Sequence, residues 1–234
     1  MIDCNAAETA IAAISPDLIT GYNDYWATIA PKNTHEVFMR WIFAFLSVHT
    51  TWSANVLGFK ILNRNTLWFN NDNLLLEHLI TSGVGIHTRR LKGISQFTKS
   101  FFEDPNSWNK QTDETWIQCR NRLATRCYGL GLAKTAFALE MCYPLENESV
   151  CLDTHMLQLY GYKTAKEKAK GMQYDTYIQM ETHWVMKCKE RSIPAAIARA
   201  IVWDKKQLKS DSRYWTYVFE NESKDNKSNL KQEV

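Results

Sequence analysis

The sequence has 234 residues, of which 45% are hydrophobic and 23% charged, and a formal net charge of +3 at pH 7. These values exclude fibrous, collagen-like and wholly disordered chains and suit one domain or two interlocked lobes. Nine glycines and five prolines beside nine Trp, ten Tyr and ten Phe favour an all-α protein over a turn-rich β-sandwich. The small positive charge permits a nucleic-acid partner without requiring one.

Apolar residues recur with helical spacing along most of the chain. The clearest stripe is Phe38, Trp41, Ile42, Phe45 and Leu46, which predicts a core helix that starts near residue 34. The other predicted helices cover residues 6–14, 17–29, 53–63, 73–82, 88–102, 112–126, 132–142, 153–160, 164–169, 174–190 and 194–208, with a further candidate at 212–219. The polar residues 221–234 predict a disordered tail.

The longest apolar stretch, residues 41–48, is far shorter than the roughly 20 residues of a membrane helix. The first residues lack the basic and apolar blocks of a signal peptide, so we expect an intracellular protein, cytoplasmic or nucleoid-associated, with no membrane partner. Six cysteines stand at irregular spacings without a C-x-x-C pair, which predicts neither a metal site nor a disulfide framework. Buried free thiols are the expected role of these cysteines.

Two glycines flank an apolar residue in the segment Cys127–Ala136, between two predicted helices. A turn of this kind can expose backbone N–H groups at a helix start, where they are able to bind a phosphate. A simple helix-to-helix turn with a glycine cap gives the same pattern. Both interpretations stay open from this segment alone.

A second pattern follows 19 residues after Lys134 (153 − 134), where Leu152-Asp153-Thr154-His155 ends an apolar run at a predicted helix start. Together these patterns resemble the helix-hairpin-helix DNA glycosylase superfamily, including its endonuclease III and 8-oxoguanine glycosylase-lyase members. Residues 45–52 and 83–92 resemble two further segments of that family in the same order. The resemblance covers about residues 35–205.

This resemblance implies an all-α fold of two helical lobes with a DNA-binding cleft between them. A six-helix lobe would span residues 45–150, with the hairpin at about 127–136. The second lobe would combine residues 1–44 with residues 151–220. The four-cysteine iron-sulfur loop of endonuclease III has no counterpart here, since only Cys188 follows the Asp motif, so we expect no cluster, other cofactor or metal.

The resemblance assigns catalysis to Asp153 and Lys134. A carboxylate beside C1′ of the sugar stabilises the positive charge that develops as the glycosidic bond breaks, although Asp153 could also serve only as a helix cap. The family's nucleophilic lysine position is occupied by Ala133, with Lys134 one residue further on. The 19-residue separation favours Lys134 as the nucleophile of the 8-oxoguanine branch, and a solvated helix lysine is the alternative.

Other residues are candidates for binding DNA or the damaged base. The expected DNA contacts are Gly129, Gly131, Leu132, His49, Arg89, Arg90 and Arg126. His49 would fill the gap left by a flipped nucleotide or cap its helix. The weaker pocket candidates, each with a packing or orienting role as the alternative, are Trp52, His155 and Trp203. Nine cations between residues 86 and 134 further indicate a basic face.

The sequence therefore predicts a DNA repair N-glycosylase that excises a damaged base from double-stranded DNA by base flipping, with an associated AP-lyase step through a lysine Schiff base. The resemblance also implies a monomer. Two alternatives stay open, namely a monofunctional glycosylase that uses Asp153 and water, and a non-catalytic DNA-binding protein.

Overall fold

The computed structural model describes residues 2–162 and 173–207, and every regular element within these ranges is helical. In chain order the α-helices are α1 (Asn5–Ala12), α2 (Pro16–Ile29), α3 (Thr34–Leu46), α4 (Trp52–Asn63), α5 (Asp72–Thr81), α6 (His87–Glu103), α7 (Trp116–Arg126), α8 (Leu132–Cys142), α9 (Thr154–Gln158), α11 (Tyr174–Glu190) and α12 (Ala195–Gln207). Two short 3₁₀-helices are η1 (Leu67–Asn70) and η2 (Pro105–Trp108). The predicted all-α class is confirmed for the described residues.

Most predicted helix ends agree with the structure to within one or two residues. The helices predicted at 132–142 and 174–190 coincide with α8 and α11. Helix α7 begins later than predicted because Thr115 and Gln118 form a capping box that fixes its first turn. The helices predicted at 164–169 and 212–219 and the polar tail at 221–234 lie outside the described residues.

Helix α3 forms the centre of the core. Every side chain from Phe38 to Leu46 is buried, so this helix is enclosed on all sides rather than along one stripe. Phe38 stacks on Phe97 of α6 with 5.4 Å between ring centroids. The one charged side chain in this stretch, Arg40, donates to the carbonyl of Ile29 at 2.6 Å. The aromatic residues that the composition emphasised therefore form the core.

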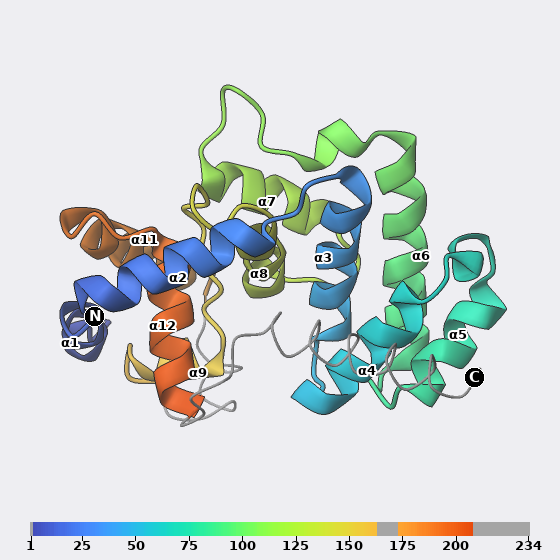
Figure 1. Ribbon diagram of the computed structural model, residues 1–234, viewed down its shortest axis with the longest axis horizontal. Coiled ribbons are helices and arrows are strands. Elements are labelled where there is room, and N and C mark those ends of the chain that lie inside the picture. Colours follow the sequence, from blue (N-terminus) through green and yellow to red (C-terminus); the bar gives the residue numbers. More distant parts are fainter. Residues whose placement is uncertain (1, 163–172, 208–234) are drawn as a thin grey trace, which may run out of the picture.

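The helices form two groups according to their contacts. In the larger helix group, α3 packs against α4, α6 and α8, α5 packs against α4 and α6, and α7 packs against α8. In the smaller helix group, α12 packs against α1, α2, α9 and α11. Figure 1 shows these groups side by side, with α7 and α8 near their junction.

The predicted lobe boundary between residues 44 and 45 falls inside α3. The contacts of α3 instead place this whole helix in the larger helix group, apart from α1 and α2. The predicted division of the chain into two lobes stays a prediction.

Two buried ion pairs connect the two helix groups. Arg120 of α7 lies 2.6 Å from Glu181 of α11, and both side chains are fully buried. Arg199 of α12 pairs with Glu140 of α8, and each of these side chains is 4% exposed. Both pairs lie at the junction where the candidate active site is found.

The six cysteines are free thiols, as the sequence predicted, and all but Cys4 are buried. Burial raises the pKa of Cys119, Cys127, Cys142, Cys151 and Cys188 to about 12. No helix in the described ranges has the length and apolar character needed to cross a bilayer.

Candidate active site

An extended segment, Val150–Asp153, leads into helix α9 at the junction of the two helix groups. Its first three residues are buried but belong to no helix or sheet, so their backbone polar groups need other partners. Glu181 accepts the N–H of Val150 at 2.8 Å. The hydroxyl of Tyr177 donates to the carbonyl of Val150 at 2.7 Å and accepts from the N–H of Leu152 at 3.2 Å. Side chains therefore provide the hydrogen bonds that a neighbouring strand would provide in a sheet.

Each carboxylate that binds this segment is also paired with an arginine. Glu140 accepts the N–H of Cys151 at 2.8 Å and pairs with Arg199, while Glu181 pairs with Arg120. Burial raises the pKa of both carboxyls, and the neighbouring arginines act in the opposite direction. Because Glu140 belongs to α8 and Glu181 to α11, the 150–153 segment is anchored to both helix groups.

The carboxylate of Asp153 is oriented by three hydrogen bonds. Its Oδ1 accepts the N–H groups of His155 at 3.0 Å and Met156 at 3.1 Å, which caps α9. Its Oδ2 accepts the indole N–H of Trp203 at 2.9 Å. The His155 ring lies edge-on to the Trp203 ring, with 6.1 Å between centroids. Asp153 is half-buried, so the carboxylate is fixed in direction and still reachable.

The predicted hairpin connects α7 to α8. Gly129 has a φ of +93°, a conformation that favours glycine, and the buried side chain of Leu130 anchors the turn in the core. Gly131 precedes α8 and provides no side chain to bind the first N–H groups of that helix. Leu132 is partly buried against the core. The geometry fits both the predicted anion-binding turn and a simple glycine cap.

Lys134 is the third residue of α8 and is half-buried. Its Nζ lies 5.2 Å from the centroid of the Phe137 ring, and within the described ranges it makes no ion pair. Burial is the main reason that the pKa of the Cys151 thiol is raised to about 12; the charge of Asp153 adds to this rise and that of Lys134 opposes it. Both charges therefore act on the same buried thiol.

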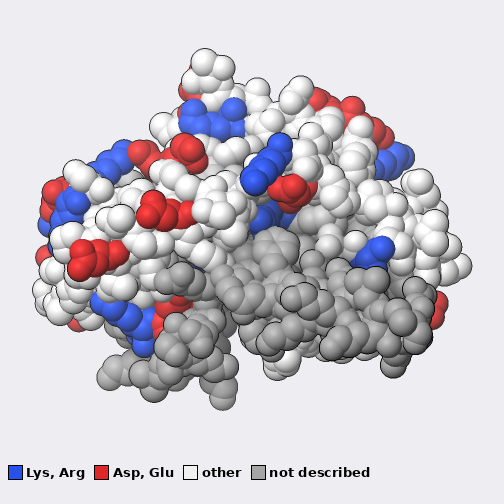
Figure 2. Space-filling model, in the orientation of Figure 1, with Lys and Arg blue, Asp and Glu red and all other residues white. Residues whose placement is uncertain are grey.

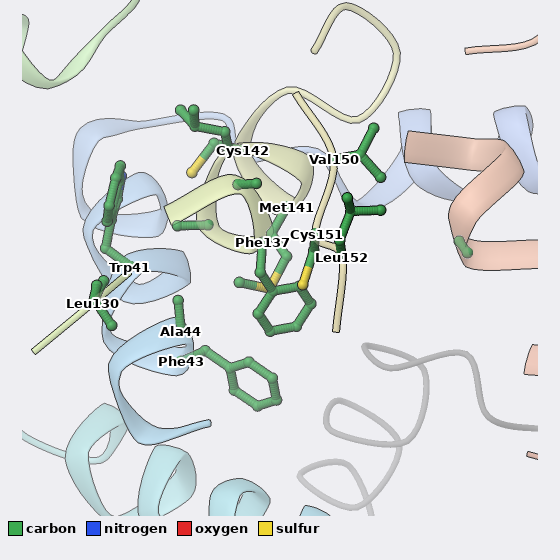
Figure 3. Packing of buried hydrophobic residues seen from close by; sticks show 14 of the residues in the cluster. Trp41, Phe43, Ala44, Leu130, Phe137, Met141, Cys142, Val150, Cys151 and Leu152 are labelled. Atoms are coloured by element: carbon green, nitrogen blue, oxygen red, sulfur yellow. The ribbon is translucent and has the colours of Figure 1, made fainter. Parts of the chain in front are cut away.

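Phe137 of α8 is surrounded by an aromatic ring and two cations. Figure 3 shows α8, which carries Phe137, between α3 with Phe43 and the extended segment with Cys151. The rings of Phe43 and Phe137 are 6.2 Å apart, and the guanidinium of Arg199 lies 5.5 Å from the Phe137 centroid. The Phe137 ring therefore lies near one aromatic ring and near the cations of Lys134 and Arg199.

Helix α6 packs very closely against the hairpin. A Cβ at Gly93 would overlap the carbonyl oxygen of Tyr128, so only glycine fits without a shift. One residue earlier, the Nζ of Lys92 lies 4.5 Å from the centroid of the Tyr128 ring. The hairpin position is therefore set by α6 as well as by α7 and α8.

A small hollow lies where the hairpin meets two other segments predicted to contact DNA. It is lined by Phe45, Val48, Ile86, Arg89, Arg90, Tyr128 and Gly129. Ile86 has a φ of +39° directly before α6, and Arg89 is exposed. The structure thus brings together the end of α3, the turn before α6 and the hairpin.

Comparison with solved structures identifies the fold. An 8-oxoguanine DNA glycosylase of Thermotoga maritima matches with a TM-score of 0.69 at 15% identity, over 90% of this chain and 100% of that one. The Methanocaldococcus jannaschii 8-oxoguanine glycosylase/lyase, in complex with a 15mer DNA containing 8-oxoguanine, matches with a TM-score of 0.66 at 17% identity, over 87% and 98%. This chain has the fold of the helical 8-oxoguanine DNA glycosylases. No family model and no curated protein sequence matches it.

Within this glycosylase fold, Arg90 is engaged inside the molecule. It is only 3% exposed, and its guanidinium donates to the carbonyls of Val48 at 2.8 Å, Val84 at 2.7 Å and Phe45. This side chain therefore caps the end of α3 and holds the turn before α6. Any contact of Arg90 with DNA stays a prediction and would have to compete with these hydrogen bonds.

Arg126 is also engaged inside the molecule. Its guanidinium donates to the carbonyl of Ser107 at 3.0 Å and the hydroxyl of Ser100 at 3.2 Å, and it lies 4.4 Å from the centroid of the Trp108 ring. These contacts connect the end of α7 to α6 and η2. Any contact of Arg126 with DNA would have to compete with them.

Ion pairs within the molecule also reduce the positive charge of the predicted basic face. Arg120 pairs with Glu181, and Arg122 pairs with Glu114 at 2.5 Å. Figure 2 shows Lys and Arg interspersed with Asp and Glu on the described surface of that view. A formal excess of cations in the sequence therefore does not translate into an equal excess of free surface charge.

His49 and Trp52 follow α3 in a turn and at the start of α4. His49 is exposed, with a φ of +47°. One interpretation of His49 was a polar cap for its helix, but at the end of α3 the guanidinium of Arg90 binds the free carbonyls. Trp52 is half-buried and lies edge-on to Phe43, with 5.7 Å between ring centroids. This contact agrees with the reading of Trp52 as a residue that packs on the core.

Sequence reasoning missed the side chains that hold the 150–153 segment. Glu140 and Arg199 stand alone as charges within apolar helical runs, and charged residues are rarely buried unless paired. That signal marks both as paired residues, but it does not identify the partner. The described residues contain no group of three or more His, Cys, Asp or Glu side chains placed to hold a metal ion.

Proposed function

We propose that this protein is a DNA repair N-glycosylase that flips a damaged base out of double-stranded DNA, with an oxidised purine such as 8-oxoguanine as the leading substrate. The observation that carries the proposal is the half-buried, oriented carboxylate of Asp153 beside the helix that begins at the hairpin. The fold supports it, because the similar solved structures are 8-oxoguanine DNA glycosylases.

In this proposal Asp153 stabilises the transition state. Breaking the bond between the base and C1′ makes the sugar cation-like, and a fixed carboxylate lowers the energy of that charge without having to reorient. The three hydrogen bonds to Asp153 provide this preorganisation. Trp52, His155 and Trp203 stay proposed as residues near the flipped base, with Trp203 and His155 next to the carboxylate.

The proposal includes an AP-lyase step in which Lys134 is the nucleophile. Its neutral amine attacks C1′ and displaces the base, which leaves with a proton. Cleavage of the C1′–O4′ bond then opens the sugar, O4′ takes up a proton, and C1′ is left as an imine of the Nζ nitrogen. The imine acidifies the C2′ proton, so that β-elimination releases the 3′ phosphate. The half-buried position of Lys134 at the start of α8 supports this role.

A monofunctional enzyme is the second candidate. It is favoured by the position of Lys134 one residue beyond the family's nucleophile, where Ala133 stands. On a helix this is a rotation of about 100°. In that case a water activated by Asp153 attacks C1′.

Borohydride trapping distinguishes these candidates. The protein is incubated with end-labelled duplexes that carry 8-oxoguanine, uracil, thymine glycol or an abasic site, and any imine is reduced to a stable adduct. We expect an adduct with the wild-type chain that disappears in Lys134→Gln. Lys99→Gln is a suitable control, because Lys99 is an exposed lysine of α6 away from the candidate nucleophile.

Each result has a direct consequence. Base loss revealed by alkali without any adduct would support the monofunctional enzyme. Absence of both base loss and adduct on every duplex would contradict the glycosylase proposal for these substrates and favour a DNA-binding protein.

A further inference from the structure

The two oxygens of the Asp153 carboxylate have different partners. Oδ1 accepts two backbone N–H groups from the start of α9. Oδ2 accepts a single N–H, from the Trp203 indole of α12 at 2.9 Å. The carboxylate turns as a unit about its terminal bond, so the two backbone bonds at Oδ1 limit this rotation and the indole bond at Oδ2 adds a restraint on the opposite oxygen. Trp203 is the described side chain that binds Oδ2.

Helix α12 is itself held on both sides of Trp203. One turn earlier, Arg199 pairs with Glu140 of α8. At the next residue, Asp204 accepts the hydroxyl of Tyr22 of α2 at 2.6 Å. The indole is thus presented from a helix whose rotation and translation are both restricted, as positioning of a reacting group requires.

Glu140 couples this arrangement to the backbone of the 150–153 segment. The same carboxylate that pairs with Arg199 of α12 accepts the N–H of Cys151, two residues before Asp153. A shift of α12 would therefore move the segment and the indole together. The two bonds of Glu140, to Arg199 and to the N–H of Cys151, therefore help to keep the distance between Trp203 and Asp153 constant.

We infer that Trp203 is a positioning residue for glycosidic bond cleavage, acting through its N–H on Oδ2 of Asp153 rather than through its ring face on the base. This inference rests on the proposed function. It separates two roles of one side chain, since stacking needs only an aromatic ring and positioning needs the N–H donor.

The substitution Trp203→Phe removes the donor and keeps an aromatic ring. Trp68→Phe is the matched control, because the Trp68 indole also donates one hydrogen bond of 2.9 Å, to the carbonyl of Leu62 in the larger helix group. Single-turnover base release and the Kd for DNA containing an uncleavable analogue are measured for both variants. Thermal unfolding of both variants measures the cost to folding.

We expect Trp203→Phe to slow base release by about 10-fold to 100-fold, the effect of a small misplacement of a catalytic group, with the Kd changed less than about 2-fold. Trp68→Phe should release base at the wild-type rate. Equal rates in the two variants would overturn the inference, and so would a loss in Trp203→Phe confined to Kd, which is the signature of stacking. Absence of base release by the wild-type chain would instead contradict the proposed function.

A second measurement does not depend on activity. The indole N–H proton of Trp203, observed by NMR in the free protein, should lie downfield because its acceptor is an anion, and it should move upfield in Asp153→Ala. An indole signal that is the same in wild type and Asp153→Ala would show that the hydrogen bond is absent in solution and would overturn the inference even if Trp203→Phe fails to fold.

Discussion

The carboxylate of Asp153 serves two purposes at once. It caps α9 through Oδ1 and binds the indole N–H of Trp203 through Oδ2, and in the proposed mechanism its negative charge stabilises the cationic sugar. Helix capping needs an acceptor oxygen, which an asparagine also has, whereas stabilising a cation needs the negative charge. The two purposes can therefore be separated by the choice of substitution.

At this residue we predict that Asp153→Ala loses about 1 kcal/mol of unfolding free energy through loss of the cap, while Asp153→Asn loses much less. Urea denaturation of the two variants provides the measurement. Equal stabilities for Ala and Asn would contradict the capping geometry, whatever the effect on activity.

Part of the site could be predicted from residue patterns and part could not. Asp153 and Lys134 could be proposed as candidates because short motifs carry them. The burial of Arg90 could not be predicted, because its carbonyl partners at the end of α3 lie 42 and 45 positions earlier in the chain. A pattern of neighbouring residues contains no information about such contacts, so a buried arginine and a phosphate-binding arginine look alike.

At the scale of elements, the contact of α6 with the hairpin depends on the absence of one side chain. We predict that Gly93→Ala destabilises the protein by about 1–3 kcal/mol, because the added methyl overlaps the carbonyl of Tyr128 and forces the hairpin outward. We also expect weaker binding to DNA. Unfolding and DNA titrations provide both measurements.

Gly21 in α2 is the matched control for this change. A Cβ there would meet nothing within 4 Å, so Gly21→Ala should be neutral or stabilise the protein by up to about 1 kcal/mol through helix propensity. A Gly93→Ala variant as stable as Gly21→Ala would contradict the close packing of α6 on the hairpin.

The start of α7 is held by an ion pair that responds to pH. The Arg122 guanidinium lowers the pKa of Glu114 from 4.5 to about 2. Because the folded state has the lower pKa, this carboxylate contributes stability above pH 4.5 that is lost as pH falls toward 2. We predict that the wild type loses about 1–2 kcal/mol more than Glu114→Gln over that range, after allowance for partial exposure. Parallel stability curves for the two proteins would contradict this account.

Helix positions could be predicted well, since apolar spacing and capping residues lie close together in the sequence. The late start of α7 is an instructive exception. Residues 112–114 have helical spacing, but Glu114 accepts the N–H of Gln111 at 2.7 Å and binds Arg122, which stabilises a turn before the capping box. Local side-chain bonds of this kind compete with helix formation.

At the scale of the whole molecule, two ion pairs connect the helix groups and support the segment that ends at Asp153. Removing one partner of such a pair leaves a buried charge without compensation. We therefore predict that Glu181→Gln costs about 3 kcal/mol of unfolding free energy and slows base release, because Arg120 loses its counter-ion and the N–H of Val150 keeps only a weaker acceptor.

Glu148→Gln is the control for this prediction. Glu148 and Lys189 also form an ion pair, with 2.7 Å between the charged atoms, but both side chains are exposed. Its loss should change stability by less than about 1 kcal/mol. Similar effects of the two substitutions would contradict the role assigned to the buried pair.

The fold class could be predicted at this scale, but the way the helix groups meet could not. Glu140 and Arg199 are 59 positions apart in the chain, and Arg120 and Glu181 are 61 apart. Their pairing depends on how α7 and α8 pack against α11 and α12, which no local pattern encodes.

The most direct test of the central claim is base release from a duplex containing 8-oxoguanine, by the wild-type chain and by Asp153→Asn, with alkali used to reveal abasic sites. We predict release by the wild type, a rate at least about 100-fold lower in Asp153→Asn, and nearly equal DNA affinities for the two proteins. An Asp153→Asn variant that releases the base as fast as the wild type would contradict the assignment of the active site.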